Sequence, residues 1–332
     1  MPLTDLAPAE LETYRPELSP PADLDQRWGR TLAEAREHDL DLRVVPVDGG
    51  LVTVDAFDVT FSGFGGEPVR AWYLRPAGVS RPLPAIVEYL GYGGGRGLVH
   101  ERLFWPSAGF AYLCMDTRGQ GSAWGGGGST PDLAGGSAGA AAPSHPGFLT
   151  RGVLDFDTYY YRRLITDAVR AVDAVRVLPG ADADLVTVTG VSQGGALTLA
   201  AAGLADGLVA AMPDVPFLCH VRRAVDLADS DPYAEVARYL AVHRGHVEQV
   251  FRTLSYVDGV HLGARAHVPA LFSVGLMDPI CPPSTVYAAF HAYGGTAEIE
   301  VYPYNGHEGG QAHHEARQLH WLRTVLGHAQ DD

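Results

Sequence analysis

The chain has 332 residues and a formal net charge of −15, and all 24 of its basic residues are arginine. Without lysine it can form neither a Walker-type phosphate loop nor a lysine Schiff base, which excludes pyridoxal-phosphate chemistry. The negative charge opposes binding to nucleic acids and to anionic membranes. No basic start precedes an apolar core, and no apolar run approaches the ~20 residues of a membrane span, so we expect a cytoplasmic protein.

The predicted elements begin with two helices and then change to strands. Helices are expected at residues 4–14 and 24–40, and an antiparallel pair of strands at 54–61 and 68–75. Apolar runs then alternate with helical periodicity. They predict strands at 85–90, 111–116, 185–189, 209–213, 270–277 and 298–302, and helices at 158–177 and 196–204. This alternation predicts a mostly parallel α/β sheet with helices on both faces.

Residues 1–332 are interpreted as one domain, because α/β sheets with insertions reach this length. Within it we expect an N-terminal helical extension at 1–45 and a helical insertion at 217–266, beside the pocket. Residues 125–146 are mostly small, with too little apolar surface to pack, so a mobile loop or a spacer without function is predicted there.

A nucleophilic serine is predicted in the segment Gly190-Val191-Ser192-Gln193-Gly194-Gly195. It lies between the strand at 185–189 and the helix at 196–204. Its glycines allow the sharp turn that exposes the serine side chain beyond the end of the strand. The same G-x-S-x-G spacing recurs at 135–139, where no strand or helix pattern flanks it. Context therefore favours Ser192. The alternative is an ordinary strand-to-helix turn.

A serine hydroxyl needs a base, and the base needs an orienting acid. In sheets of this type the acid and then the histidine follow the serine along the chain, each after a strand. Asp278 ends the run at 270–277, and His307 follows the strand at 298–302 in a loop of small residues. Asp214 also follows a strand-like run, which makes Asp278 the least determined member of the triad. All three side chains are expected beyond the carboxyl ends of the strands.

Two backbone N–H groups are candidates for an oxyanion hole. One belongs to Gln193, directly after the nucleophile, and the other to Tyr92, in the glycine-rich loop that follows the strand at 85–90. The alternative for this loop is a phosphate cradle, but no register of it gives G-x-G-x-x-G.

We expect no catalytic metal and no cofactor. The segment His307-Glu308-Gly309-Gly310-Gln311 departs from H-E-x-x-H at its fifth position, although further possible ligands follow at His313, His314 and Glu315. The three cysteines, Cys114, Cys219 and Cys281, show no metal or redox spacing.

Three of the most specific segments are Arg118-Gly119-Gln120-Gly121, the Ser192 turn and His307-Glu308. With Tyr92-Gly93-Gly94-Gly95-Arg96-Gly97, they resemble the acetyl xylan esterase and cephalosporin-C deacetylase family, carbohydrate esterase family seven. The resemblance reaches from about residue 14 to residue 307 and implies an α/β-hydrolase fold. Two departures are Gly93, where asparagine is usual, and Pro279, where a polar residue is commoner.

The resemblance implies a serine esterase that removes O-acetyl groups from short acetylated xylo-oligosaccharides and from cephalosporin C, through an acetyl-enzyme. It also implies a side activity in which hydrogen peroxide replaces water, and a ring-like hexamer whose pockets face an interior chamber. The implied partners are small acetylated substrates.

Supporting residues are predicted around the triad. Arg118 and Glu308 are expected to form an ion pair that braces the His307 loop, with Gln120 as a further support; the alternative is two unrelated surface charges. The pocket wall is predicted to contain Tyr92, Trp105, Trp124 and Pro216, whose bulk would limit the acyl group to acetyl. For these residues the alternative is simple packing.

Two other functions remain open at this point. One is a serine peptidase of the prolyl-oligopeptidase type, although such enzymes normally carry a propeller domain for which the chain has no room. The other is a binding protein that keeps the hydrolase fold without catalysis, against which the predicted triad argues.

Overall fold

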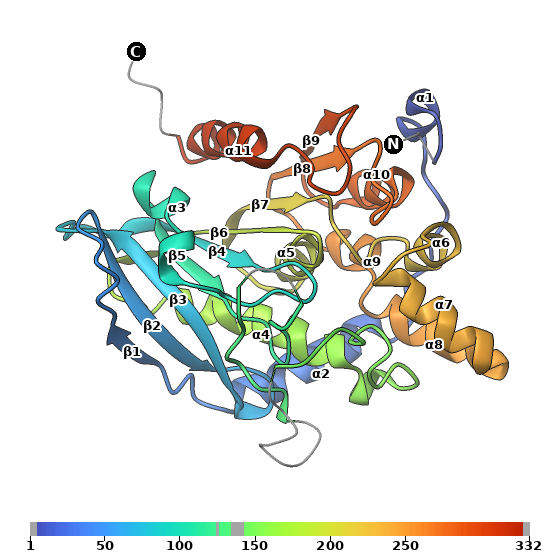
Figure 1. Cartoon of the computed structure of the whole chain (residues 1–332), viewed down its shortest axis with the longest axis horizontal. Helices are drawn as coiled ribbons and strands as arrows, with labels where there is room; N and C mark the ends of the chain where they lie inside the picture. Colours follow the sequence, from blue (N-terminus) through green and yellow to red (C-terminus); the bar gives the residue numbers. More distant parts are fainter. Residues whose placement is uncertain (1–4, 124–125, 134–142, 328–332) are drawn as a thin grey trace.

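The computed structural model describes residues 5–123, 126–133 and 143–327 (Figure 1). In this part of the chain, the centre is a nine-stranded sheet with the order β1-β2-β3-β5-β4-β6-β7-β8-β9. The strands are β1 Arg43–Pro46, β2 Val54–Ser62, β3 Pro68–Pro76, β4 Leu83–Tyr89, β5 Ala111–Met115, β6 Ala181–Val191, β7 Leu208–Asp214, β8 Ala270–Gly275 and β9 Ala297–Tyr302. The pairs β1–β2, β2–β3 and β3–β5 are antiparallel, and all pairs from β5 to β9 are parallel. The predicted mostly parallel sheet is confirmed.

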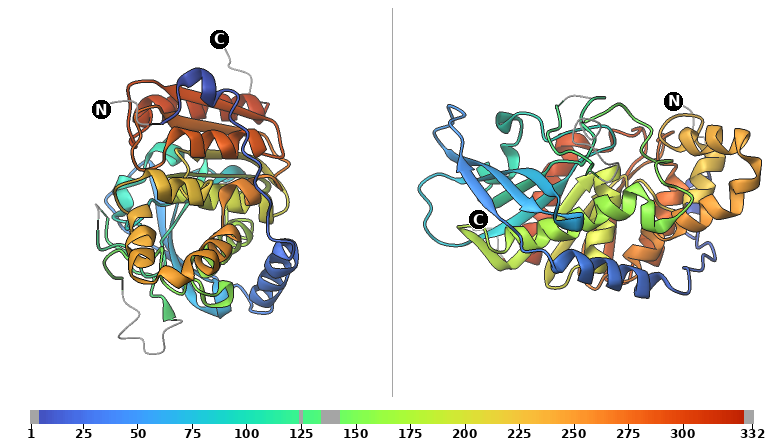
Figure 2. Two further views of the ribbon diagram at one scale, coloured as in Figure 1. Left: turned by 90° about the vertical axis from the view of Figure 1, so that its right-hand side faces the viewer. Right: turned by 90° about the horizontal axis from the view of Figure 1, so that it is seen from below.

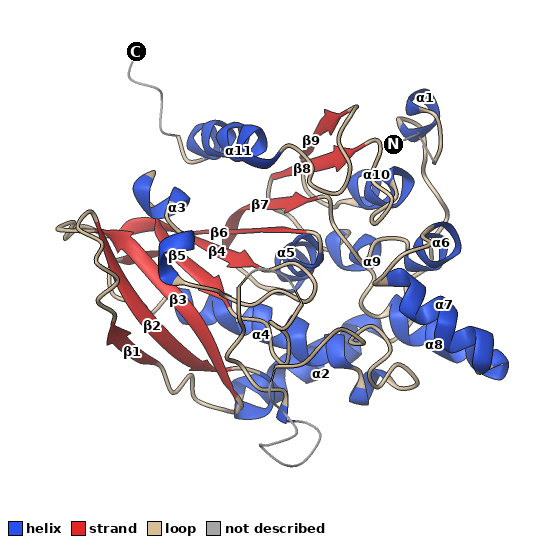
Figure 3. Cartoon of the chain, viewed as in Figure 1, coloured by secondary structure: helices blue, strands red, loops and turns tan. Residues whose placement is uncertain are grey.

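Helices cover both faces of the sheet (Figure 3). One face carries α3 (Phe104–Ser107) and α11 (Gln311–Val325), and the other carries α4 (Tyr160–Val175), α5 (Gln193–Leu204), α9 (Gly259–Gly263) and α10 (Pro283–Ala292). The buried apolar residues accordingly form two clusters, a smaller one under α3 and α11 and a larger one under the other helices. Among the residues that the structure describes, no helix is both long and apolar enough to cross a membrane.

The N-terminal extension covers the outer side of α4. Its chain runs from α1 (Pro8–Leu11) beside α10 to α2 (Leu24–Arg36) along the helical layer (Figure 2). As a result α4 is buried on nearly all sides, although the sequence predicted a single apolar face. Its buried arginines keep polar partners; Arg162 Nε donates to Thr31 Oγ1 of α2 at 2.9 Å. Arg163 forms an ion pair with Asp132 at 2.7 Å.

The helical insertion predicted at 217–266 lies between β7 and β8. It consists of α6 (Val221–Leu227), α7 (Tyr233–Val242), α8 (Val247–Ser255) and the already named α9. In Figures 1 and 2 the helices α7 and α8 project from one end of the sheet. The Trp28 indole N–H of α2 donates to the Tyr256 carbonyl at 2.8 Å, which links the insertion to the N-terminal extension.

Some element boundaries differ from those predicted. The helix expected at 24–40 ends at Arg36, and four residues later the Leu40 carbonyl accepts a hydrogen bond from Ser62 N at 2.8 Å, shortly before the chain enters β1. The short edge strand β1 has little apolar pattern and was not predicted, nor were α3, α10 and α11. The loop predicted at 125–146 falls partly outside the described residues, which include 126–133 and 143–146 of it.

Candidate active site

Ser192 lies on a strained turn between β6 and α5, with φ 59° and ψ −116°, a conformation that costs energy for a residue with a side chain. The flanking glycines are needed sterically. A Cβ at Gly190 would lie 2.6 Å from the Tyr89 carbonyl oxygen, and one at Gly194 would lie 2.1 Å from it. The turn is held by hydrogen bonds from Ser192 N to the Asp214 carbonyl and from Phe217 N to the Ser192 carbonyl, at 2.9 and 3.0 Å.

The three side chains of the predicted triad meet beyond the strand ends. His307 Nε2 lies 2.8 Å from Ser192 Oγ, and His307 Nδ1 lies 2.8 Å from Asp278 Oδ2. The other carboxylate oxygen of Asp278 accepts the N–H groups of Ile280 and Cys281 at 2.8 and 2.9 Å. Asp278 is 1 % exposed, so these contacts fix its orientation. With Nδ1–H donating to Asp278, Nε2 is free to accept the Ser192 proton.

The loop that carries Tyr92 is tied to the start of α5 through two glutamines. Gly93 N donates to Gln120 Oε1 at 2.6 Å, and Gln120 Nε2 donates to Gln193 Oε1 at 2.9 Å. Gln193 Nε2 in turn donates to the Leu90 carbonyl at 3.1 Å. Gln193 is the first residue of α5, so its backbone N–H has no carbonyl partner within the helix. Gln120 thus supports the turn that carries Gln193 and the loop that carries Tyr92.

A pocket of about 480 Å³ opens over Ser192 and His307. Tyr92 lines it, as predicted from the sequence. The remaining walls come largely from residues that sequence reasoning missed: His145, Pro146, Asp231, Pro232 and Ile280. Asp231 and Pro232 lie directly before α7. The only sequence signal for them was the position of the insertion after β7, next to the nucleophile turn.

The other predicted wall residues do not line this pocket. Trp105 belongs to α3 on the opposite face of the sheet, where its ring packs against Phe110 with 5.7 Å between centroids, so this prediction is wrong. Pro216 is also not a wall residue, because it lies buried against Gly195 at the start of α5. Trp124 falls outside the described residues.

The predicted ion pair between Arg118 and Glu308 is wrong. Arg118 is fully buried and points toward α4, where its guanidinium pairs with Asp167 at 2.5 Å and with Glu67 at 2.6 Å. Burial alone would lower the pKa of Arg118, but the two carboxylates raise it above its ordinary value. Glu308 instead closes its own loop, accepting from Asn305 Nδ2 at 3.0 Å and from Gly306 N at 3.1 Å.

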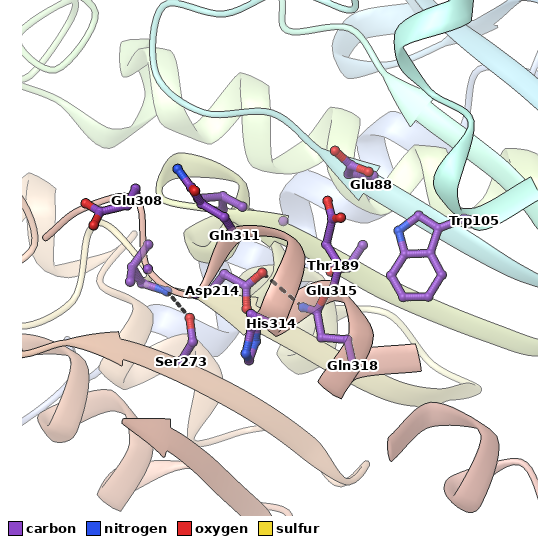
Figure 4. Close-up of a pocket in the computed structure, with 15 residues that line it drawn as sticks. Glu88, Trp105, Thr189, Asp214, Ser273, Glu308, Gln311, His314, Glu315 and Gln318 are labelled. Atoms are coloured by element: carbon purple, nitrogen blue, oxygen red, sulfur yellow. Dashed lines mark hydrogen bonds and ion pairs between the residues drawn. The ribbon is translucent and has the colours of Figure 1, made fainter. Parts of the chain in front are cut away.

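A second cavity, of about 80 Å³, lies between α11 and the sheet (Figure 4). In it His314 Nε2 lies 2.6 Å from Asp214 Oδ1, and Gln318 Nε2 donates to Asp214 Oδ2 at 3.0 Å. The Tyr302 hydroxyl lies 3.0 Å from His314 Nδ1. Asp214, the alternative triad acid, therefore pairs with a different histidine. Trp105 lies toward one end of this cavity.

One group of side chains in the described part of the chain could in principle hold a metal ion. Ligand atoms of Asp278, Cys281 and His307 lie within 4.8 Å of one another. Asp278 and His307 are already joined to each other, and His307 to Ser192. Burial raises the pKa of the Cys281 thiol well above its ordinary value, so at neutral pH this sulfur is a protonated thiol and a weak ligand.

Comparison with known proteins agrees with this geometry. The family described as "Acetyl xylan esterase (AXE1)" matches residues 1–325. The solved acetyl xylan esterase from Paenibacillus sp. R4 is 38 % identical, with a TM-score of 0.88, and the match covers 96 % of this chain and 99 % of that one. Acetyl Xylan Esterase 1 from Thermoanaerobacterium sp. JW/SL YS485 is 30 % identical, with a TM-score of 0.85 and coverage of 97 % and 99 %.

A curated relative, acetyl esterase Axe7A of Xylanibacter ruminicola, is 27 % identical over 302 residues, which are 89 % of this chain. The match spans 65 % of that relative's length. The close similarity to the solved esterases identifies the fold as that of an α/β hydrolase.

Proposed function

The chain belongs to the acetyl xylan esterase family, and on this premise we propose that it is a serine esterase that removes O-acetyl groups from short acetylated xylo-oligosaccharides. The observation that carries the proposal is the continuous line from Ser192 Oγ through His307 to Asp278, with 2.8 Å at each step, at the floor of an open pocket. These are the distances that acyl transfer by a serine requires.

In the proposed mechanism, Ser192 Oγ attacks the acetyl carbonyl carbon while His307 Nε2 takes the hydroxyl proton. Asp278 stabilises the imidazolium that results. The backbone N–H groups of Tyr92 and Gln193 donate to the tetrahedral oxyanion, and the loss of one such donor typically costs ~3 kcal/mol in the barrier. His307 then protonates the departing sugar oxygen. Water, activated by the same imidazole, releases acetate from the acetyl-enzyme.

Further properties of this proposal rest on the resemblance to carbohydrate esterase family seven. They are deacetylation of cephalosporin C, formation of peracids from hydrogen peroxide and assembly as a hexamer. A cytoplasmic location is also proposed, although it does not rest on the resemblance. Light scattering coupled to gel filtration tests the assembly: a particle six times the mass of the 35.4 kDa chain supports the hexamer, and any other mass contradicts it.

The activity is tested with a panel of esters and one amide. The panel contains acetylated xylobiose, cephalosporin C, acetyl, butyryl and longer-chain p-nitrophenyl esters, and a Gly-Pro-anilide. We expect hydrolysis of the acetyl esters, little of the longer acyl esters and none of the anilide, with Ser192→Ala protein as the control for contaminating esterases. Cleavage of the anilide would point to a peptidase. Folded protein without activity on any acetyl ester would contradict the proposal.

A further inference from the structure

A buried carboxylate outside the triad joins three segments that wall the pocket. Glu235 of α7 is 8 % exposed; its Oε1 accepts a hydrogen bond from the Tyr92 hydroxyl at 2.6 Å, and its Oε2 accepts one from the Leu149 N–H at 3.1 Å. Resting on the esterase function proposed above, we infer that Glu235 is a positioning residue, which holds the Tyr92 loop and the strap of residues 143–149 in place and thereby sets acyl-chain selectivity.

The hydrogen bonds of the Tyr92 hydroxyl require Glu235 to act as an acceptor. The hydroxyl accepts the N–H groups of Gly147 and Phe148 at 3.2 and 2.9 Å, so both of its lone pairs are used. A phenol has a single proton, which points to Glu235. A group at position 235 must therefore accept from Tyr92 and from Leu149 at the same time. A carboxylate can do so, whereas the amide of glutamine has one acceptor and one donor end.

Glu235 is connected to three of the segments that wall the pocket. Asp231 and Pro232 line the pocket directly before α7, the helix that carries Glu235. His145 and Pro146 line the pocket from the strap, and Leu149 of the same strap donates its N–H to Glu235. Tyr92 lines it from the loop after β4. The Glu235 carboxylate is thus bonded to Tyr92 and to the strap, and it belongs to the helix that directly follows Asp231 and Pro232.

Burial raises the pKa of Glu235 above its ordinary value, while the bonds from Tyr92 and Leu149 act in the opposite direction. The ionised form is costly at this depth and depends on those two donors. Removing either partner leaves a buried polar group unsatisfied, which favours movement of the loop or the strap. Movement of the loop displaces the proposed oxyanion donor of Tyr92, and movement of the strap widens the pocket.

The test compares Glu235→Gln, Tyr92→Phe and the double variant. Both single changes keep side-chain size and alter the same hydrogen bond from opposite ends. Glu248→Gln is the matched control, because Glu248 lies in the same insertion with 87 % of its side chain exposed. For each protein we measure kcat and KM with p-nitrophenyl acetate and p-nitrophenyl butyrate, and the melting temperature.

We expect each single variant to lose about 10- to 100-fold in kcat on the acetate, the size of effect that a small misplacement of catalytic groups produces. The loss on the butyrate should be smaller, so the ratio of acetate to butyrate activity falls. The losses of the double variant should be smaller than the product of the two single losses, since both changes break the same hydrogen bond between Tyr92 and Glu235. Glu248→Gln should match the unmodified protein in both activity and selectivity.

Two results would overturn this inference without touching the esterase function. One is an unchanged ratio of acetate to butyrate activity in the single variants, and the other is a double variant whose losses multiply. If Glu235→Gln does not fold, Tyr92→Phe alone still decides, because the same fall in ratio is required of it. Inactivity of the unmodified protein on both esters would instead contradict the proposed function itself.

Discussion

Two histidine–aspartate pairs of the described structure, an outer pair of His307 and Asp278 and an inner pair of His314 and Asp214, differ in what surrounds them. Their histidines are seven residues apart in sequence. His307 and Asp278 lie 2.8 Å apart at the floor of the open pocket, and 27 % of the His307 side chain is exposed. His314 and Asp214 lie 2.6 Å apart beneath α11, and only 4 % of the His314 side chain is exposed. The outer nitrogen of His307 faces Ser192 Oγ, whereas the second nitrogen of His314 lies near the Tyr302 hydroxyl.

The comparison teaches that pairing with a carboxylate does not by itself make a histidine catalytic. His314 has the acid, but its second nitrogen faces the Tyr302 hydroxyl rather than a serine, and the cavity beside it, of about 80 Å³, is far smaller than the pocket of about 480 Å³ over Ser192. Its place indicates a mechanical role. Asp214 ends β7 and its carbonyl holds the Ser192 N–H, while His314 lies in α11, directly after the His307 loop. The inner pair therefore links the two segments that carry the proposed nucleophile and base.

Replacing the two histidines by alanine should separate the pairs most strongly. His307→Ala removes the proposed base, and we expect kcat on p-nitrophenyl acetate to fall by about 10⁴- to 10⁶-fold. His314→Ala should lose less than about tenfold, because no atom of His314 contacts the reacting groups. Steady-state kinetics on both proteins, with circular dichroism to verify folding, checks this. Equal losses would mean that the inner pair takes part in the reaction.

Replacing Asp278 and Asp214 by asparagine tests whether the two pairs differ in their contribution to catalysis, with smaller expected effects than at the histidines. Asp278→Asn keeps the shape but presents an amide that cannot stabilise the imidazolium, and we expect a loss of about 10⁴-fold in kcat. Asp214→Asn should lose less than about tenfold. The experiment measures kcat over a range of pH for both variants. A larger loss in Asp214→Asn would make Asp214 the functional acid and reverse the assignment.

For the free energy of unfolding we expect the opposite order, with the larger loss in His314→Ala and the smaller loss in His307→Ala. His314→Ala leaves the partly buried Asp214 without one of its partners, and we expect the free energy of unfolding to fall by about 1–3 kcal/mol. His307→Ala lies at an open pocket and should cost less. Urea unfolding of both variants, followed by tryptophan fluorescence, measures the difference. A His307→Ala protein less stable than His314→Ala would contradict the mechanical role of the inner pair.

The smallest effect is expected at Cys281, the thiol beside the outer pair. Because burial raises its pKa, the protonated form dominates throughout pH 7–8, and alkylation needs the thiolate. Iodoacetamide at pH 8 should therefore leave the esterase activity unchanged over an hour. Rapid inactivation, absent from a Cys281→Ala variant, would show that the thiol is ionised and reachable beside Ser192.

Local sequence patterns were sufficient for the parts of the site that depend on neighbouring residues. Glycines at 190 and 194 are required by contacts within two adjacent strands and one turn, so the Ser192 turn could be recognised from its own segment. The strand before Asp278 was predicted because a buried parallel strand is a continuous apolar run, and the strand before His307 was predicted because its apolar and polar residues alternate. The parallel sheet then brings their ends to one edge.

Partners contributed by distant segments could not be predicted in this way. Arg118 could have paired with any exposed carboxylate until α4 was placed beneath it, and Asp214 and Asp278 were both plausible acids until α11 covered one of them. Glu235 is a charged residue on a short helix with no motif around it, and its link to Tyr92 spans 143 positions.

The chain order of serine, acid and histidine, the strand–helix alternation and the nucleophile turn are therefore written in short stretches of residues, where steric constraints act within a few bonds. The choice of each buried charge's partner, the pocket walls and the separation of the two histidine–aspartate pairs emerge only when the helices pack. These features depend on which side chains are buried against one another, and that is determined only by the tertiary structure.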